Sequence, residues 1–221
     1  MKKRVVQVSL LILVTFALGI PAIAGSNTAN EPQADMVKWG SYLNQHSGGG
    51  SVPMKRNAAA KNKTDIVWKG EQAVITRDAL KQATYYYQLM GEDDAQAAES
   101  ALEYLMEHEA LYCEASKKGY QATDQEAKEM VDKIRTAYQD GSMGEESKKQ
   151  LQAVISQFDS EDAYWEYELQ VYKKDLPIMN MNNDNEAAYY KDHPGATPQD
   201  YQKWFADYKK ELVKAENFKK A

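Results

Sequence analysis

Cysteine, histidine and phenylalanine are scarce in this chain of 221 residues, and the scarcity excludes several kinds of protein. The single cysteine, Cys113, rules out an internal disulfide framework. His108 and Glu109 begin like the zinc-protease motif H-E-x-x-H, but Tyr112 stands where the second histidine is required. The other two histidines lie far away in the sequence. The sequence therefore predicts no metal site and no other cofactor.

Motifs of the common enzyme classes are also absent. The chain has no G-x-S-x-G nucleophile elbow, no Walker phosphate-binding loop and no dinucleotide-binding fingerprint. Three consecutive acids, Glu92, Asp93 and Asp94, stand at a predicted helix start, where negative charge interacts favourably with the helix dipole. Capping explains these acids better than general acid–base catalysis does. We therefore expect no catalytic residues.

The one long apolar stretch of the chain lies at its N-terminus. Three basic residues precede an apolar segment over residues 5–20, and an A-x-A pattern that ends at Ala24 follows it. Polar residues interrupt the segment, which makes it short and impure for a permanent membrane span. We expect a signal peptide over residues 1–24, cleaved after Ala24, and hence an exported protein that keeps no stable span. A retained N-terminal anchor is the alternative.

The rest of the chain is acidic and of moderate size. Cleavage after Ala24 would leave 197 residues with 24 basic and 33 acidic side chains, a net charge of −9. This balance argues against nucleic acid or an anionic membrane surface as the main partner. Residues 25–64 show little periodicity and are expected to be a flexible linker, with one short helical turn around Trp39, Tyr42 and Leu43. Residues 65–221 are expected to form one helical domain.

Helical periodicity dominates from residue 65 onward. The alternating run 66–76 predicts a short strand or hairpin, after which Thr76 caps a helix. A later helix is expected to end or kink at Pro177, with an Asn-rich loop over 180–185 and a weak helix beyond it. The predicted helices span 77–90, 94–118, 124–140, 145–158, 160–177 and a last one that begins at Thr197 and Pro198. The fold class is therefore all-α and multi-helix, with one short β segment at its start and a C-terminal helix that packs back.

The second and third of these helices are joined by a tight corner with a distinctive pattern. Gly119 ends the second helix in the left-handed conformation, and Tyr120 folds back on that helix. Thr123 and Glu126 form a capping box for the third helix. The apolar stripe before the corner consists of Leu102, Leu105, Met106, Leu111 and Ala115. With an Ile-Thr pair at 75–76 that opens the first helix, the pattern resembles the N-terminal chaperone domain of the SurA and PrsA group of exported foldases.

The resemblance covers about residues 66–172, with a looser similarity in the final helix. It implies a helical domain that holds unfolded exported polypeptides. Many proteins of this group also carry a parvulin domain that isomerises X-Pro bonds, but only 24 residues separate Tyr172 from Thr197, too few for such a domain. We therefore expect a non-catalytic, chaperone-like protein that lacks a parvulin domain. A minimal or degenerate prolyl isomerase and a cell-envelope adaptor for one fixed partner are the alternatives.

Tyrosine and tryptophan are abundant, with 15 and four residues against four phenylalanines. Tyr85, Tyr86 and Tyr87 cannot all face one core, because consecutive helical residues point about 100° apart. Two interpretations remain open: the aromatic residues fill a helical core, or they line a surface that binds unfolded or extended polypeptides. For the second interpretation the candidate peptide-binding residues are Tyr85, Tyr86, Leu89, Met90, Tyr164, Trp165, Trp204 and Phe205.

Overall fold

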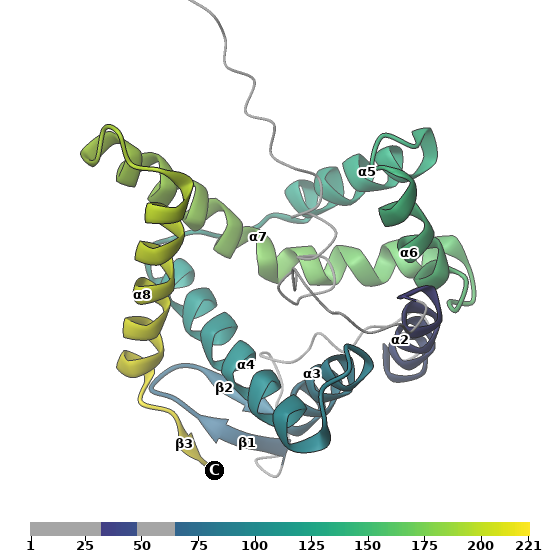
Figure 1. Cartoon of the computed structure of the whole chain (residues 1–221), viewed down its shortest axis with the longest axis horizontal. Helices are drawn as coiled ribbons and strands as arrows, with labels where there is room; N and C mark the ends of the chain where they lie inside the picture. The colour runs from purple at the N-terminus through teal and green to yellow at the C-terminus, as the bar shows by residue number, and fades with distance from the viewer. Residues whose placement is uncertain (1–31, 48–64) are drawn as a thin grey trace, which may run out of the picture. The chain divides into compact units, whose positions relative to one another are not determined.

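The structure is a computed structural model that describes residues 32–47 and 65–221 (Figure 1). Within these residues it has seven helices and three short strands, which confirms the predicted all-α, multi-helix fold class. The elements are α2 (Pro32–Ser47), β1 (Ile66–Lys69), β2 (Val74–Thr76), α3 (Arg77–Leu89), α4 (Asp94–Lys117), α5 (Asp124–Asp140), α6 (Glu145–Ile155), α7 (Glu161–Asp192), α8 (Pro198–Glu216) and β3 (Lys219–Lys220). The predicted signal peptide lies outside the described residues.

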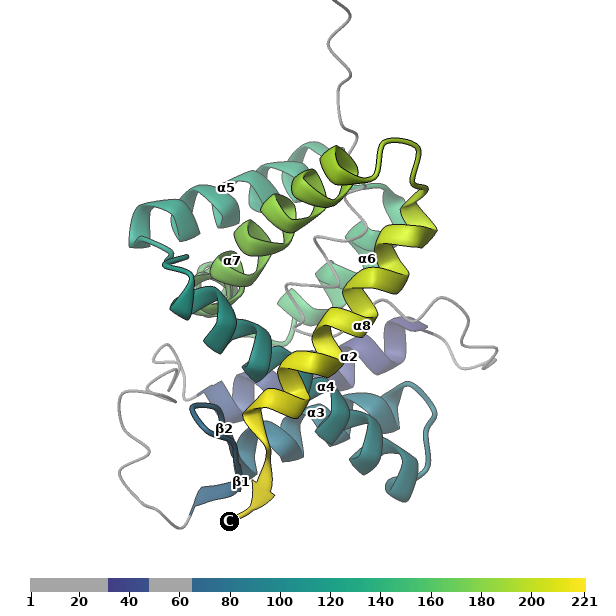
Figure 2. The same cartoon turned by 90° about the vertical axis from the view of Figure 1, so that its left-hand side faces the viewer.

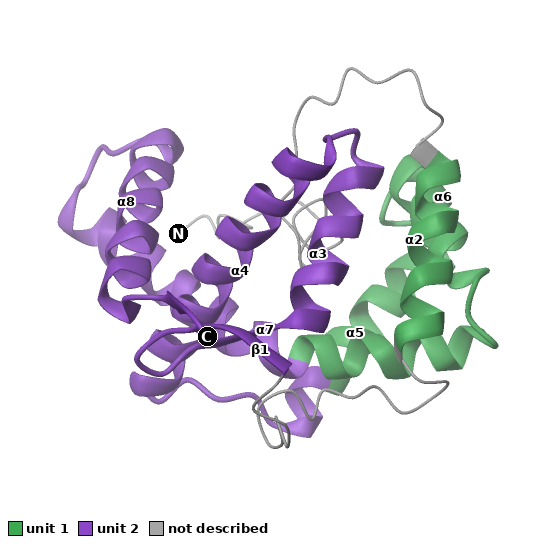
Figure 3. Ribbon diagram, turned by 90° about the horizontal axis from the view of Figure 1, so that it is seen from below, with its two compact units in different colours: residues 1–52, 128–172 green, residues 53–127, 173–221 purple. Residues whose placement is uncertain are grey.

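The chain divides into two compact units (Figure 3). Unit 1 comprises residues 1–52 and 128–172, and unit 2 comprises residues 53–127 and 173–221. Unit 1 therefore holds α2, α6, most of α5 and the first part of α7, whereas unit 2 holds the sheet, α3, α4, α8 and the second part of α7. The helical domain predicted over residues 65–221 is thus shared between the two units.

In unit 1, α2 packs against α6. Met36, Trp39 and Leu43 recur at a spacing of three or four residues and are at most 6% exposed. At Gly40 the two backbones come so close that a Cβ would lie 2.6 Å from the carbonyl oxygen of Val154. The structure thus differs from the predicted linker over residues 32–47, because their apolar stripe has a partner and supports a helix of 16 residues rather than a single turn.

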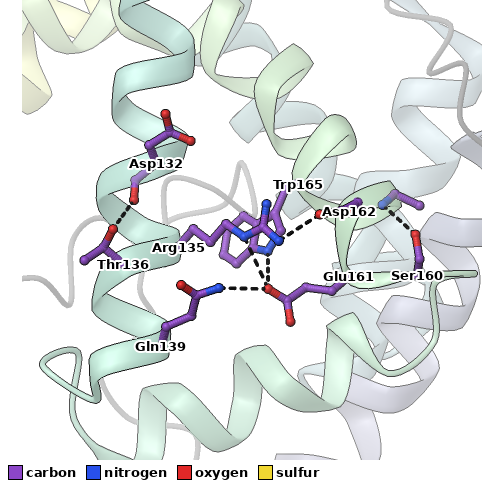
Figure 4. A network of polar contacts seen from close by, with 9 residues as sticks. Asp132, Arg135, Thr136, Gln139, Ser160, Glu161, Asp162 and Trp165 are labelled. Atoms are coloured by element: carbon purple, nitrogen blue, oxygen red, sulfur yellow. Dashed lines mark hydrogen bonds and ion pairs between the residues drawn. The ribbon is translucent and has the colours of Figure 1, made fainter.

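A polar network joins α5 to the start of α7 in unit 1 (Figure 4). The Arg135 guanidinium contacts carboxylate oxygens of Asp162 at 2.7 Å and Glu161 at 3.3 Å, and lies over the Trp165 ring. The Trp165 indole N–H donates to Glu161 at 3.0 Å. Ser160 caps α7 by accepting the Ala163 N–H at 3.0 Å. Arg135 and Glu161 therefore fix both the face and the edge of the Trp165 ring.

In unit 2 the three strands form a small antiparallel sheet in the order β2-β1-β3. The hairpin of β1 and β2 confirms the β segment expected at the start of the domain, whereas β3 follows α8 and was not predicted (Figure 2). Glu216, at the end of α8, is buried, and its carboxylate accepts the N–H groups of Gln72 and Ala73 at 2.8 and 2.9 Å. The last helix thereby holds the hairpin turn, and it packs along α4 as a C-terminal helix that packs back.

The corner between α4 and α5 has the predicted local geometry. Gly119 has a φ of 86°, and the Tyr120 N–H donates to the Ala115 carbonyl oxygen at 2.9 Å. Thr123 and Glu126 exchange the two hydrogen bonds of a capping box. These signals act between neighbours in the sequence, so the residues alone were enough to predict them.

The helix predicted to end or kink at Pro177 instead continues, and the predicted Asn-rich loop over 180–185 is part of it. An end at Pro177 and a loop over 180–185 are therefore wrong, whereas a kink at Pro177 stays a prediction. Proline removes one backbone hydrogen bond, at a cost of about 3 kcal/mol in a helix interior. Leu176, Ile178 and Met181 are at most 5% exposed, and burying each contributes about 1.5–3 kcal/mol. Burial around the proline therefore offsets its cost.

No described helix carries an apolar stretch long enough to cross a bilayer.

Candidate polypeptide-binding surface

Aromatic side chains gather on one face of unit 2, where α8 lies beside the end of α7. On α8 they occupy positions separated by three or four residues, which helical geometry places on the same face. We call this set the aromatic face: Tyr189 and Tyr190 from α7, and Tyr201, Trp204, Phe205 and Tyr208 from α8. The capping box of Thr197 and Asp200 begins α8 and sets the rotation of the helix about its axis.

The rings of the aromatic face contact one another in a continuous row. The Trp204 ring is stacked between Tyr201, with centroids 5.7 Å apart, and Tyr208, with centroids 5.3 Å apart. Tyr189 lies 5.5 Å from both Tyr201 and Trp204, so the two helices contribute to one row. Such offset and tilted ring pairs stabilise the arrangement beyond the burial of their area. The row is therefore built in advance of any partner.

Hydrogen bonds and a small apolar core hold the row in place. The Tyr201 hydroxyl donates to the Asn182 side-chain oxygen at 2.7 Å, and the Tyr208 hydroxyl accepts from the Lys118 ammonium at 3.1 Å. Burial raises the pKa of the Tyr201 phenol, and the Glu186 carboxylate raises it further, so this hydroxyl stays protonated. Beneath the row, a core of Leu111, Ala115, Ile178 and Met181 packs against Phe205, Tyr208 and Leu212.

Trp204 is the part of the aromatic face that a partner can reach. Its side chain is 36% exposed, and it is the exposed large hydrophobic residue of the described chain. Exposing a tryptophan in a fixed row leaves apolar area uncovered in water, which favours its burial by another molecule. The neighbouring tyrosines add an apolar ring with a polar tip to the same surface.

The structure distributes the eight predicted site residues over three places. Trp204 and Phe205 belong to the aromatic face. Tyr86, with Tyr85, Leu89 and Met90 beside it, lies at α3, where Tyr86 is 7% exposed and the other three are half-buried. Tyr164 and Trp165 lie in unit 1 and are 1% and 4% exposed, so they present almost no surface. Their role in binding polypeptide stays a prediction.

Sequence reasoning left four residues of the aromatic face out of the site. Tyr201 and Tyr208 share the helical spacing of Trp204 and Phe205, so the same pattern would have included them. Tyr189 and Tyr190 had no such signal, because they fell in a weak helix after an expected loop. Only the continuation of α7 to Asp192 brings them beside α8.

A buried polar cluster lies between α4 and α7 in unit 2. Lys174 pairs with Glu109, and the His108 Nε2 lies 3.0 Å from an Asp175 oxygen. Burial alone would raise the pKa of Glu109, but the Lys174 ammonium and then His108 hold it at about 2. Burial alone would lower the pKa of His108, but its hydrogen bonds to Asp175 and Glu109 raise it above its usual value. The cluster joins helices α4 and α7 through these two pairs.

Metal chemistry has no support in this cluster. Over residues 32–47 and 65–221, no group of three or more His, Cys, Asp or Glu side chains is arranged to hold a metal ion. The pairing of His108 with Asp175 and of Glu109 with Lys174 uses these groups as ion pairs between helices. The aromatic face is therefore the stronger candidate for a functional site.

Comparison with known proteins adds no assignment. No protein-family model, no curated protein and no solved structure matches this chain. The resemblance of the corner to the SurA and PrsA group stays a prediction. A function for this chain has to be inferred from its own residues, above all from the aromatic face.

Proposed function

We propose that this protein is an exported, non-catalytic, chaperone-like protein that binds unfolded or extended polypeptides on the aromatic face of unit 2. The observation that carries the proposal is the row of six contacting rings in which Trp204 stays 36% exposed. The corner motif and the N-terminal export signal of the sequence are consistent with it.

Binding would occur by reversible burial of apolar client side chains against the row. Trp204 supplies the exposed ring, and the tyrosines supply hydroxyl groups that bond to a client backbone without a defined sequence. Because the row is already held by Asn182 and Lys118, little side-chain entropy is lost when a client binds. The surface is small, so each contact is weak and clients are released again.

Charge would influence which clients bind. Glu186 lies close enough to the row to raise the pKa of both Tyr190 and Tyr201. A protein with a net charge of −9 after cleavage attracts basic or neutral clients and repels other copies of itself. Acidic unfolded clients are therefore expected to bind this face less tightly.

The test is the suppression of aggregation of a reduced, unfolded client protein, followed by light scattering, with Kd measured by titration calorimetry. We expect suppression at near-stoichiometric ratios and a Kd about tenfold higher in Trp204→Ala, since an exposed aromatic anchor contributes on the order of 1.4 kcal/mol. Gln202→Ala is the matched control, because Gln202 is exposed on the same helix and lies outside the row. Equal binding by wild type and Trp204→Ala, or no binding by either, contradicts the proposal.

A further inference from the structure

Strand β3 pairs antiparallel with one edge of β1 and brings two lysines opposite each other. Lys219 lies opposite Lys69, and Lys220 lies opposite Trp68. The next residue continues the ladder, because the Ala221 N–H donates to the Val67 carbonyl oxygen at 3.0 Å. Residues directly opposite each other in an antiparallel pair point to the same face of the sheet. Two lysine side chains therefore face each other across the edge of β1.

No carboxylate of the described residues forms an ion pair with either lysine. On its other side Lys69 lies opposite Val74 of β2. Lys69 and Lys219 are both exposed, and neither takes part in any ion pair formed within residues 32–47 and 65–221. Like charges directly opposite each other weaken strand pairing. Pairing between β1 and β3 is thus less favourable than the backbone hydrogen bonds alone would make it.

The chain is anchored firmly just before β3 and weakly within it. The Glu216 carboxylate and carbonyl oxygen accept three N–H groups from residues 71–73. Asn217 then turns the chain with a φ of 51°, in the left-handed region that favours glycine. Only the two residues of β3 follow as strand, and both side chains are exposed. The anchor at Glu216 can persist while residues 219–221 leave the edge.

We propose that the edge of β1 is a binding site for an extended polypeptide segment with an acidic side chain opposite Lys69, and that residues 219–221 occupy this edge until such a segment displaces them. The incoming strand takes over the backbone hydrogen bonds of β3, as in other cases of strand addition. It also replaces the Lys69–Lys219 repulsion by an attraction between Lys69 and a carboxylate.

Two features single out this edge and this partner. A short edge strand that carries lysines protects a sheet from pairing with other chains, so β3 shields β1 when no partner is present. An acidic side chain opposite Lys69 is attracted to its ammonium group, whereas Lys219 in the same position is repelled by it. The site uses no residue of the aromatic face, so it stands or falls independently of the function proposed above.

The experiment uses the full chain, labelled for NMR, and three short synthetic peptides of alternating threonine and valine. One peptide has a central glutamate, the second has a central lysine, and the third has the glutamate with alternate backbone nitrogens methylated so that it cannot add as a strand. We expect the glutamate peptide to bind about fivefold more tightly than the lysine peptide. We also expect the signals of residues 219–221 to shift to those of an unpaired segment as the glutamate peptide binds. The methylated peptide should leave the signals of residues 219–221 in place.

Two neighbouring substitutions separate cross-strand pairing from general electrostatics. Lys219→Glu places a carboxylate opposite Lys69, which should strengthen β3, slow hydrogen exchange of the Ala221 amide and raise the Kd of the glutamate peptide by about fivefold. Lys220→Glu makes the same change of charge on the face that Trp68 occupies and should leave both quantities within about twofold.

Several outcomes would overturn the proposal. Equal effects of Lys219→Glu and Lys220→Glu would mean that only net charge matters. Displacement of residues 219–221 by the methylated peptide would mean an anion site without strand addition, and peptide binding that leaves residues 219–221 in place would mean another site. Absence of binding would also refute it. Trp204→Ala serves as a further control: it should leave peptide binding at the β1 edge unchanged even where it abolishes suppression of aggregation.

Discussion

The two units use the same kinds of aromatic residue in opposite ways. In unit 1, Trp39, Tyr164 and Trp165 are at most 4% exposed, whereas in unit 2 Trp204 is 36% exposed. The rings contact one another in both places, with centroids 4.9 Å apart for Tyr164 and Trp165 and 5.3 Å apart for Trp204 and Tyr208. The cluster around Trp165 thus lies in the interior of unit 1, whereas the row around Trp204 reaches the surface of unit 2.

The difference lies in what covers each ring. Arg135 covers the face of Trp165 and Glu161 bonds to its indole N–H, so that ring has no side left for a partner. Trp204 is flanked within its row only by other rings of α7 and α8. Substitutions in unit 1 should therefore change stability, and substitutions in the aromatic face should change binding.

Trp39→Ala is expected to have the largest effect on stability. Trp39 is 1% exposed on α2, which packs on α6, so its removal leaves a cavity in unit 1. Truncating a buried tryptophan costs about 3–5 kcal/mol. Urea unfolding followed by circular dichroism measures the change in free energy. A loss below about 1 kcal/mol would mean that α2 does not belong to the core of unit 1.

The same measurement on Trp204→Ala sharpens the comparison. Because Trp204 is partly exposed, we expect a loss of about 1 kcal/mol or less. A loss as large as that for Trp39→Ala would show that Trp204 is a core residue in solution, and the distinction between the two units would fail.

Lys174→Met tests the buried ion pair of unit 2. It leaves Glu109, which is 7% exposed, without the Lys174 ammonium, and removing one partner of a buried pair costs about 3–5 kcal/mol. Lys173→Met is the matched control, since Lys173 pairs with Asp124, whose side chain is 88% exposed, and such pairs contribute about 0–1 kcal/mol. Equal losses in urea unfolding would contradict a structural role for the Glu109–Lys174 pair.

Acid titration gives a second readout for the Glu109–Lys174 pair. The pKa of Glu109 falls from 4.5 to about 2 on folding, so the stabilisation is present above pH 4.5 and is lost as the pH falls towards 2. Lys174→Met should reduce this loss, because Lys174 is the largest factor that lowers the pKa. Between pH 4.5 and 2, the free energy of unfolding should therefore fall less steeply with falling pH in Lys174→Met than in the wild type.

Features that depend on neighbours in the sequence could be predicted. The bounds of α5 match the prediction at both ends, and those of α3 and α4 match within one residue, because caps and glycines mark them. The capping boxes at Thr123 and Thr197 and the positive φ of Gly119 follow from the same local chemistry.

Features that depend on distant partners could not be predicted. Helix α2 forms because α6 covers its apolar stripe. Helix α7 continues through Pro177 because residues of α4 bury Ile178 and Met181. Strand β3 forms because β1 has an unpaired edge with which it can pair. The same limit applies to the candidate site. Spacing put Trp204 on one face of a helix, but only packing decides that Tyr164 and Trp165 are covered while Trp204 is not.

The pH dependence that His108 gives to the stability of unit 2 is the smallest expected effect, because it depends on a single proton. His108 faces Glu109 and Tyr104 on its own helix, and Lys174 and Asp175 on α7. Its folded pKa lies above 6.5, so the stabilisation is complete below pH 6.5 and is lost as the pH rises through the folded pKa. Deprotonation leaves two carboxylates facing one cation. We therefore expect the free energy of unfolding to fall as the pH rises from 6.5 through the folded pKa, and to fall less in His108→Gln. Equal slopes in the two proteins would mean that His108 is neutral in the folded state, and that the Glu109–Lys174 pair alone provides the charge that joins α4 to α7.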